Sequence, residues 1–408
     1  MRLRPPYLLH LLAIVVGVVT LSANAVSQRY LVHTYGELDG LPSGRIADIA
    51  QDAAGRIWFA TRQHLASYDG YEWSTPLFAA GMGPQTMERV LVDDLDRVWA
   101  LPAKAKNRVI CRIDGSWRQL PLLPDLDMAS GQLPWTAATT WTGPQGTELL
   151  GTIGGVHSYR CAGASWQPLV WPAELRDATI TDIEQAGSAL FVATTSGLYR
   201  VDAEFRTASL VPGTGESRIL GLGRDPTNET VWVLADPWLG RVSGSELHIA
   251  VEDLGISGQA ASYYEGPIVD RLGGVLVGAM RHVLRYDPRG SVEPITRANG
   301  LAKEGATGLL CDREGNVWVG SVGWASKLVD LRFATADAEH GLLETEVTAL
   351  VQRADGTYAV GHPTGITLVP DLQAFGSRQQ HRLQHIQLDV PLDPAHRLLD
   401  LEERADGT

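Results

Sequence analysis

Residues 52–61 read DAAGRIWFAT, and residues 312–321 read DREGNVWVGS. Both stretches place the aspartate and glycine of a tight turn ahead of a short apolar run with a central tryptophan. A third copy, DRLGGVLVG, occupies residues 270–278. With weaker copies there are eight repeats, whose successive anchor positions are 41 to 50 residues apart. The anchor residues are Trp58, Trp99, Leu149, Phe191, Trp232, Leu276, Trp318 and Ala359. Self-similarity at this spacing indicates a repeat architecture.

Each repeat has the pattern of four short β-strands. In the first repeat, residues 46–51 alternate between apolar and polar side chains, and residues 57–60 form a buried-strand pattern after the turn. Residues 65–68 follow as a third strand, and the turn at residues 69–70 leads into a fourth. No segment keeps a helical period, which disfavours a helical solenoid. Four strands per repeat are the content of one propeller blade, so the sequence predicts an all-β propeller.

Two recurring positions have expected structural roles. A blade buries its faces only against neighbouring blades, so the large anchor side chains are predicted to fill the space between adjacent sheets. These structural anchors are Trp58, Trp99, Phe191, Trp232 and Trp318. The turn aspartates are expected to accept hydrogen bonds from nearby backbone N–H groups rather than to bind calcium, which needs several oxygen ligands in one loop. They are Asp52, Asp93, Asp270 and Asp312.

The first repeat, with GLPS at residues 40–43 and the run up to residue 70, resembles the two-component regulator propeller repeat. The resemblance covers roughly residues 30–408 and is strongest in the first and seventh repeats. It implies seven-bladed propellers, commonly two in tandem, that form the periplasmic sensor of a bacterial receptor. The whole receptor would be membrane-anchored and dimeric, with a histidine kinase or diguanylate cyclase output. The implied partner is a small molecule or an oligosaccharide.

The count of repeats predicts the domains. Residues 26–330 are expected to form one seven-bladed propeller of four-stranded blades, with residues 30–35 as the outer strand of the seventh blade. Residues 332–342 restart the pattern seen before the first repeat, so residues 331–408 are interpreted as the first one and a half blades of a second, truncated propeller. A single eight-bladed ring is the alternative. Because the sequence stops inside a repeat without an output domain, we interpret the chain as a fragment or truncated product.

The N-terminus predicts export. Residues 1–25 combine a basic start, an apolar run at residues 8–21 and the small-x-small pattern of Ala23 and Ala25, as in a cleaved signal peptide. An uncleaved anchor is the alternative, but the run is shorter than the roughly 20 residues that span a bilayer. The expected location is the periplasm. The net charge of −13 argues against a nucleic-acid partner.

Catalytic and cofactor motifs are missing from the sequence. No phosphate-binding loop, nucleophile elbow, zinc-protease motif or CxxC pair occurs, so we expect no enzyme activity, cofactor or metal. Cys111, Cys161 and Cys311 are interpreted as small buried hydrophobes, with one disulfide left open. The leading hypothesis is a ligand-sensing module. A scaffold for protein partners and a polysaccharide-degrading propeller enzyme are the alternatives.

One irregularity predicts a ligand site. In the repeat family that the sequence resembles, the turn between the second and third strands usually has a glycine. Gly155, Gly197 and Gly365 keep it in repeats 3, 4 and 8, whereas other residues replace it in repeats 1, 5, 6 and 7. The replacing residues are His64, Trp238, His282 and Trp324. Because these four blades are consecutive in a closed seven-bladed ring, the indoles and imidazoles are predicted to gather on one face and stack on sugar rings or aromatic ligands. Arg62 and Arg281, in the same turns, could pair with an acidic group.

Overall fold

The computed structural model describes residues 29–402, except 43, 77–84, 105–107, 122, 124–133, 144–145, 163–164, 256–263, 280, 330, 332–333, 336–337, 339–340, 371–382, 389–397 and 399. The predicted signal peptide and the last six residues therefore lie outside the described residues. The described part is all-β, and its only helices are short 3-10 turns. These are η1 (Glu37–Asp39), η3 (Ala173–Leu175) and η5 (Arg297–Asn299). No helix in the described ranges has the length and apolar character needed to cross a membrane.

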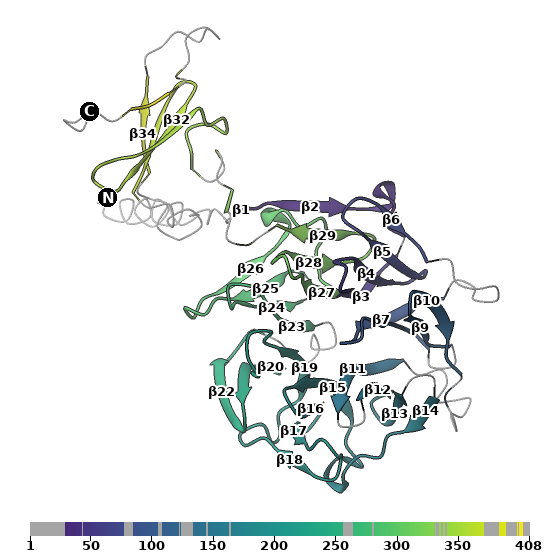
Figure 1. Ribbon diagram of the computed structural model, residues 1–408. Helices are drawn as coiled ribbons and strands as arrows, with labels where there is room; N and C mark the ends of the chain where they lie inside the picture. Colours follow the sequence, from purple (N-terminus) through teal and green to yellow (C-terminus); the bar gives the residue numbers. More distant parts are fainter. Residues whose placement is uncertain are drawn as a thin grey trace, which may run out of the picture. The chain divides into compact units, whose positions relative to one another are not determined.

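The chain divides into two compact units, one of residues 30–333 and one that contains the strands after residue 333. In its described part, the first unit contains seven four-stranded antiparallel sheets (Figure 1). Sheet 1 comprises β3 (Ile46–Gln51), β4 (Ile57–Thr61), β5 (Leu65–Tyr68) and β6 (Trp73–Ser74). Sheet 2 comprises β7 (Met87–Val92), β8 (Val98–Pro102), β9 (Ile110–Ile113) and β10 (Ser116–Gln119). Sheet 3 comprises β11 (Trp135–Gly143), β12 (Gly146–Ile153), β13 (His157–Ala162) and β14 (Ser165–Pro168).

The remaining sheets repeat this order. Sheet 4 comprises β15 (Ile180–Ala186), β16 (Ala189–Thr194), β17 (Gly197–Val201) and β18 (Ala208–Leu210). Sheet 5 comprises β19 (Ile219–Arg224), β20 (Val231–Ala235), β21 (Leu239–Ser243) and β22 (Glu246–Val251). Sheet 6 comprises β23 (Glu265–Val269), β24 (Val275–Gly278), β25 (Val283–Tyr286) and β26 (Val292–Ile295). Sheet 7 comprises β27 (Gly308–Cys311), β28 (Val317–Gly320), β29 (Ala325–Leu328) and, at its edge, β2 (Val32–Tyr35).

The first strands of the seven sheets lie next to one another in cyclic order. Each first strand contacts the first strand of the following sheet, and β27 of sheet 7 contacts β3 of sheet 1 (Figure 1). The all-β fold of four-stranded sheets predicted from the repeats is therefore present. The ring of first strands surrounds the axis of the unit, which is where a propeller presents its central channel.

An N-terminal strand completes sheet 7. Strand β2 pairs antiparallel with β29, with Val32 opposite Leu328 and Tyr35 opposite Ala325. The Tyr35 ring also stacks on Trp318 of β28, with the ring centroids 5.7 Å apart. This confirms that residues near 30–35 supply the outer strand of the seventh sheet, with the strand itself at residues 32–35.

The anchor side chains pack between neighbouring sheets. Trp58 packs against Met87 and Val90 of sheet 2, and Trp99 packs against Trp135 of sheet 3. Phe191, Trp232 and Trp318 do the same at the boundaries between sheets 4 and 5, 5 and 6, and 7 and 1. All five are buried. Burial of such side chains stabilises each boundary by roughly 2–3 kcal/mol per residue.

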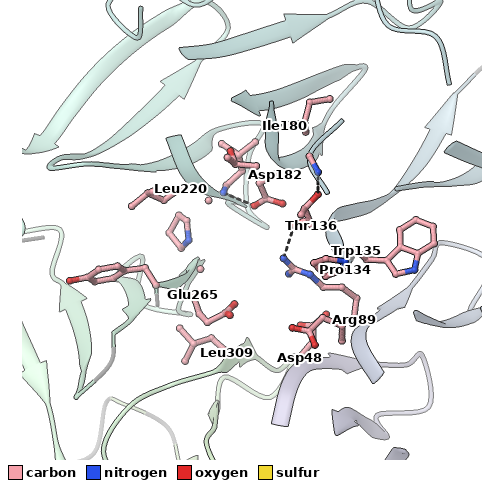
Figure 2. A pocket seen from close by; sticks show the side chains of 18 of the residues that line it. Asp48, Arg89, Pro134, Trp135, Thr136, Ile180, Asp182, Leu220, Glu265 and Leu309 are labelled. Carbon is pink, nitrogen blue, oxygen red and sulfur yellow. Dashed lines mark hydrogen bonds between the residues drawn. The ribbon is translucent and has the colours of Figure 1, made fainter. Parts of the chain in front are cut away.

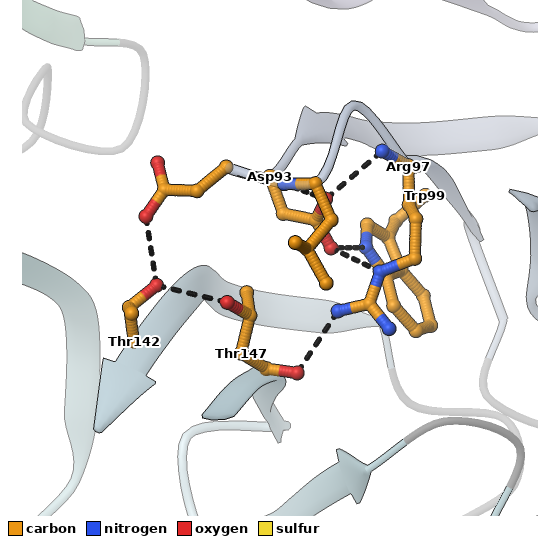
Figure 3. Close-up of polar contacts among 7 residues, drawn as sticks. Asp93, Arg97, Trp99, Thr142 and Thr147 are labelled. Carbon is orange, nitrogen blue, oxygen red and sulfur yellow. Dashed lines mark hydrogen bonds and ion pairs between the residues drawn. The ribbon is translucent and has the colours of Figure 1, made fainter. Parts of the chain in front are cut away.

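The turn aspartates bind the backbone and also the anchor residue. Asp93 Oδ1 accepts a hydrogen bond from Arg97 N at 2.9 Å, and Asp93 Oδ2 accepts one from the Trp99 indole at 2.9 Å (Figure 3). The Arg97 guanidinium bonds the same carboxylate and reaches Thr147 O of sheet 3 at 2.9 Å. In sheet 6 the anchor is Leu276, and Arg285 Nε takes the place of the indole, 2.7 Å from Asp270 Oδ2. The turn-capping role predicted for these aspartates is confirmed.

The second unit contains one more four-stranded antiparallel sheet in its described part. It comprises β31 (Ala349–Gln352), β32 (Tyr358–His362), β33 (Gly365–Val369) and β34 (Gln384–Gln387). Its small core contains Leu342, Val360 and Val369. Two further short strands are β1 (Arg29–Tyr30) and β30 (Ala334–Thr335).

Candidate ligand-binding cavity

The first strands enclose a cavity of about 600 Å³ at the axis of the first unit (Figure 2). Every sheet from 1 to 7 contributes at least one lining residue. A volume of this size lies within the range that small-molecule pockets occupy. Its polar lining carries charges of both signs, which distinguishes it from an apolar packing gap.

Irregular strand register places side chains at the cavity. In sheets 1 to 5 the pairing of the first and second strands shifts near the start of the first strand, which leaves one extra residue. The extra residues are Ala47, Glu88, Thr136, Thr181 and Leu220. The residues that directly follow them are Asp48, Arg89, Ala137, Asp182 and Gly221, and all of these but Ala137 line the cavity. A β-bulge redirects a side chain at the end of a sheet in this way. At Gly221 a Cβ atom would lie 2.1 Å from Gly266 O, so the close approach of β19 and β23 requires glycine.

Asp48 and Asp182 join neighbouring sheets. Asp48 accepts hydrogen bonds from Ile49 N at 2.9 Å and from Val90 N of sheet 2 at 3.0 Å. Asp182 accepts the equivalent pair from Ile183 N at 2.9 Å and Leu222 N of sheet 5 at 2.8 Å. Both carboxylates therefore have a structural role, and both also add negative charge to the cavity wall.

Arg89 and Glu265 have few protein partners. The Arg89 guanidinium points into the cavity and donates one long hydrogen bond, from Nη2 to Thr136 O at 3.4 Å (Figure 2). Within the described ranges the Glu265 carboxylate accepts no hydrogen bond, and neither residue forms an ion pair within 4.0 Å. An arginine has five N–H donors, so most of the hydrogen-bonding capacity of Arg89 remains for water or a ligand.

Enclosure by protein shifts the acid–base behaviour of these groups. Burial raises the pKa of Glu265 to about 8, and the nearby Arg89 lowers it only in part. Burial raises the pKa of Asp48 to about 6, and it raises that of Asp182. Burial disfavours the charged form of Arg89, but the carboxylates of Asp48 and Glu265 outweigh it and keep its pKa above the usual value. Arg89 therefore stays positive, while burial shifts the acids around it toward their protonated form, most strongly for Glu265.

The six site residues predicted from sequence lie beside the mouth of the cavity. Their turns follow the second strands, at the face where the first strands begin. Backbone hydrogen bonds tie these turns to the residues ahead of the first strands: Arg62 N donates to Arg45 O, and Asp236 N to Arg218 O. The turns of sheets 1 and 5 therefore adjoin the cavity-lining residues Arg45 and Arg218, and none of the six predicted residues lines the cavity. They are His64, Trp238, His282, Trp324, Arg62 and Arg281.

These six residues differ in their exposure. Trp238 is only 9% exposed, packs in the core between sheets 4 and 5, and donates from Nε1 to Ser217 Oγ at 3.3 Å. It therefore has little indole surface left for stacking, contrary to our expectation. Trp324 is 41% exposed and covers Gly36. His64 and His282 are half-buried, and burial lowers the pKa of His282, whereas Arg62 and Arg281 are exposed. A shared ligand for these residues stays a prediction.

Sequence reasoning missed Arg89 and Glu265. A comparison of the repeats at the third residue of each first strand would have found Arg89, because Asp48 and Asp182 occupy the equivalent positions. Cys111 and Cys161 are buried as predicted, whereas Cys311 is only partly buried, and none of the three forms a disulfide. Among the described residues no group of three or more His, Cys, Asp or Glu is placed to hold a metal ion.

The comparisons with known proteins agree with this fold. Residues 40–63 match the family model described as two component regulator propeller. They span the start of sheet 1, from the residue after η1 to the turn after β4. The resemblance to this repeat is thereby confirmed for residues 40–63. A search of curated protein sequences found no match.

Several solved structures share the fold. The extracellular domain of BT3049, assigned as a hybrid two component system of B. thetaiotaomicron, aligns with a TM-score of 0.62 at 13% identity over 93% of this chain and 51% of that domain. The corresponding domain of BT4673 from B. thetaiotaomicron gives 0.54 at 16% identity over 93% and 50%. The chain thus spans about half the length of these two domains. A streptogramin B lyase gives 0.57 at 16% identity over 73% and 97%. The likeness at these identities concerns the fold, which both sensor domains and enzymes use.

Proposed function

We propose that this chain is the periplasmic ligand-sensing β-propeller module of a bacterial signal-transduction receptor. The sheets of residues 30–333 act as one seven-bladed propeller closed by β2, and the sheet of β31–β34 begins a second propeller. The signal peptide of residues 1–25 directs export and is removed. An output domain of the receptor would receive the signal from this module.

One observation carries the sensing function: the first strands surround a cavity that displays a cationic side chain, Arg89, and an acidic side chain, Glu265, both with few protein partners. Keeping the polar groups of Arg89 and Glu265 in this cavity costs free energy unless they are paired, because enclosure weakens their solvation. A structural core would pair such groups or replace them with apolar residues. The match to a two component regulator propeller repeat and the alignment with extracellular domains support the receptor context.

A ligand screen on the whole mature chain tests the proposal. The melting temperature is measured in the presence of amino acids, short peptides, organic acids, sugars and oligosaccharides. Each compound that raises it is recovered, and its mass is determined by mass spectrometry. We expect saturable stabilisation by a ligand class that is recovered unchanged. Recovery of a converted product, including new reducing ends from an oligosaccharide, would establish an enzyme. Binding of no small molecule would favour a scaffold for protein partners.

Export has its own test. The N-terminus of protein from a periplasmic fraction, read by mass spectrometry, is expected at Val26. Protein that still begins at Met1 would show that residues 1–25 remain as an anchor.

A further inference from the structure

We propose that the cavity at the propeller axis binds a small zwitterion, whose carboxylate pairs with Arg89 and whose ammonium group pairs with Glu265. Amino acids and short ω-amino acids are the simplest members of this class. The proposal rests on the proposed function in one respect, namely that the ring binds a small molecule.

The two charged side chains come from opposite parts of the ring of first strands. Arg89 belongs to β7 of sheet 2, and Glu265 begins β23 of sheet 6. Figure 2 shows both side chains directed into the same cavity. They do not pair with each other within 4.0 Å in the described structure, so each leaves an open position for a group of opposite charge.

Arg89 is suited to a carboxylate. Its guanidinium donates a single long hydrogen bond to Thr136 O, which leaves its paired N–H groups for a bidentate contact. Asp48 does not fill this role, since its oxygens already accept N–H groups from Ile49 and Val90. A guanidinium that neighbouring carboxylates keep ionised without bonding it is a site for an incoming anion.

The surroundings of Arg89 reject a simple anion. Asp48, Asp182 and Glu265 contribute three acids against the two guanidinium groups of Arg89 and Arg218, and the third, Arg45, already lies 3.9 Å from Glu88. A ligand with only a carboxylate would be repelled by the acids of the cavity wall. A ligand with only an ammonium group would be repelled by Arg89. A neutral ligand would leave the charge of Arg89 uncompensated and would not favour ionisation of Glu265. A zwitterion satisfies both positions.

An ammonium group would also stabilise the ionised form of Glu265. Its pKa of about 8 reflects burial, which Arg89 and Arg45 offset only in part and which the carboxylates of Asp48 and Asp182 reinforce. A cationic group beside it would favour the ionised carboxylate. Ligand binding near neutral pH should therefore release a proton, which calorimetry in buffers of different ionisation enthalpy measures.

The experiment uses ω-amino acids of increasing chain length, namely glycine, β-alanine, 4-aminobutanoate and 6-aminohexanoate. Butylamine and butyrate are the probes with one charge only, and glucose and cellobiose are neutral probes. Binding to the mature chain is measured by calorimetry and thermal melting. We expect one chain length to bind at least about tenfold more tightly than either singly charged probe, as two charge-assisted contacts imply.

Substitutions test whether Arg89 binds the carboxylate end of the ligand and Glu265 its ammonium end. Arg89→Gln should weaken the best zwitterion by about tenfold or more and leave butylamine unaffected or improved, and Arg89→Lys should restore part of the loss. Glu265→Gln should weaken the zwitterion similarly and abolish the proton release. Matched controls are Arg176→Gln and Glu246→Gln, which change exposed residues outside the cavity and should leave affinity unchanged. Circular dichroism verifies that each variant is folded.

Three results would overturn the proposal. Equal binding of butylamine and the best ω-amino acid would define a site for cations. Stabilisation by a neutral sugar alone would refute the zwitterion while leaving the sensing function intact. Binding of none of the probes, nor of any member of the wider screen, would refute both.

Discussion

The indole Nε1 of Trp58 donates a hydrogen bond of 2.9 Å to Oδ2 of Asp52, six residues earlier in the chain. The same hydrogen bond, also of 2.9 Å, joins Trp99 to Asp93 and Trp318 to Asp312. One carboxylate thus closes the turn with one oxygen and orients the anchor indole with the other. Sequence identity between repeats is therefore highest where turn and core depend on the same residue.

Replacement of this aspartate should destabilise the unit. In Asp52→Ala the buried indole N–H and Arg56 N lose their acceptor, and we expect a loss of about 2–3 kcal/mol in the free energy of unfolding. Urea denaturation measures it. Asp69→Ala is the control, since Asp69 accepts Tyr71 N and Glu72 N at an exposed turn and their N–H groups return to water. Equal losses in both variants would contradict the role of the indole bond.

Strand β2 should hold the ring closed. Deletion of residues 29–35 removes the partner of β29 and the Tyr35 ring that stacks on Trp318. The unpaired edge should lower the melting temperature and promote aggregation, followed by differential scanning fluorimetry and light scattering. Leu31→Ala changes a 48% exposed residue of the same segment and should leave both unchanged. A deletion variant that melts like the parent would point to another closure.

Glu265 should make stability depend on pH. Its pKa is raised from 4.5 to about 8, so the folded state holds a proton that the unfolded state releases. The corresponding stability is fully present below pH 4.5 and is lost as the pH rises through about 8. Glu265→Gln stays neutral, so it should gain stability relative to the parent as the pH rises from about 5 to about 9. Melting curves across this range provide the test, with Glu246→Gln as an exposed control. A difference that does not change with pH would argue against the raised pKa.

The buried thiols should be unreactive in the folded protein. Burial raises the pKa of Cys111 and of Cys161 to about 12, so neither forms the thiolate that alkylating reagents require. Cys311 is less enclosed and should react first. Labelling with iodoacetamide at neutral pH, before and after addition of guanidinium chloride, counts the modified thiols by mass. Rapid modification of Cys111 in the native state would contradict the structure.

Much of the fold could be predicted because its determinants are local. The Asp-x-x-Gly turn, the apolar run and the anchor at Trp58 lie within a few residues of each other and recur along the chain. The strand partner of Tyr35 was also predictable, because a repeat count that leaves one strand missing in sheet 7 requires another segment to supply it.

The cavity was harder to predict from sequence. Arg89 and Glu265 are 176 positions apart, and neither belongs to a recognisable ligand-binding motif. Only the cyclic arrangement of the sheets brings them to one space. The unusual turns were a visible signal, but hydrogen bonds such as that from Arg62 N to Arg45 O place those of sheets 1 and 5 beside cavity-lining residues, and none of the six predicted residues lines the cavity.

Closure by β2 also governs how this unit can fold. Ala325, which pairs with Tyr35, is synthesised about 290 residues later, so the last ladder has a very large sequence separation. The entropy cost of closing so long a loop grows only slowly with length, but pairing at high contact order is slow. Until β29 arrives, β2 has no native partner and sheet 7 has an open edge. The ring therefore acquires its full cooperativity only after nearly the whole unit has been synthesised.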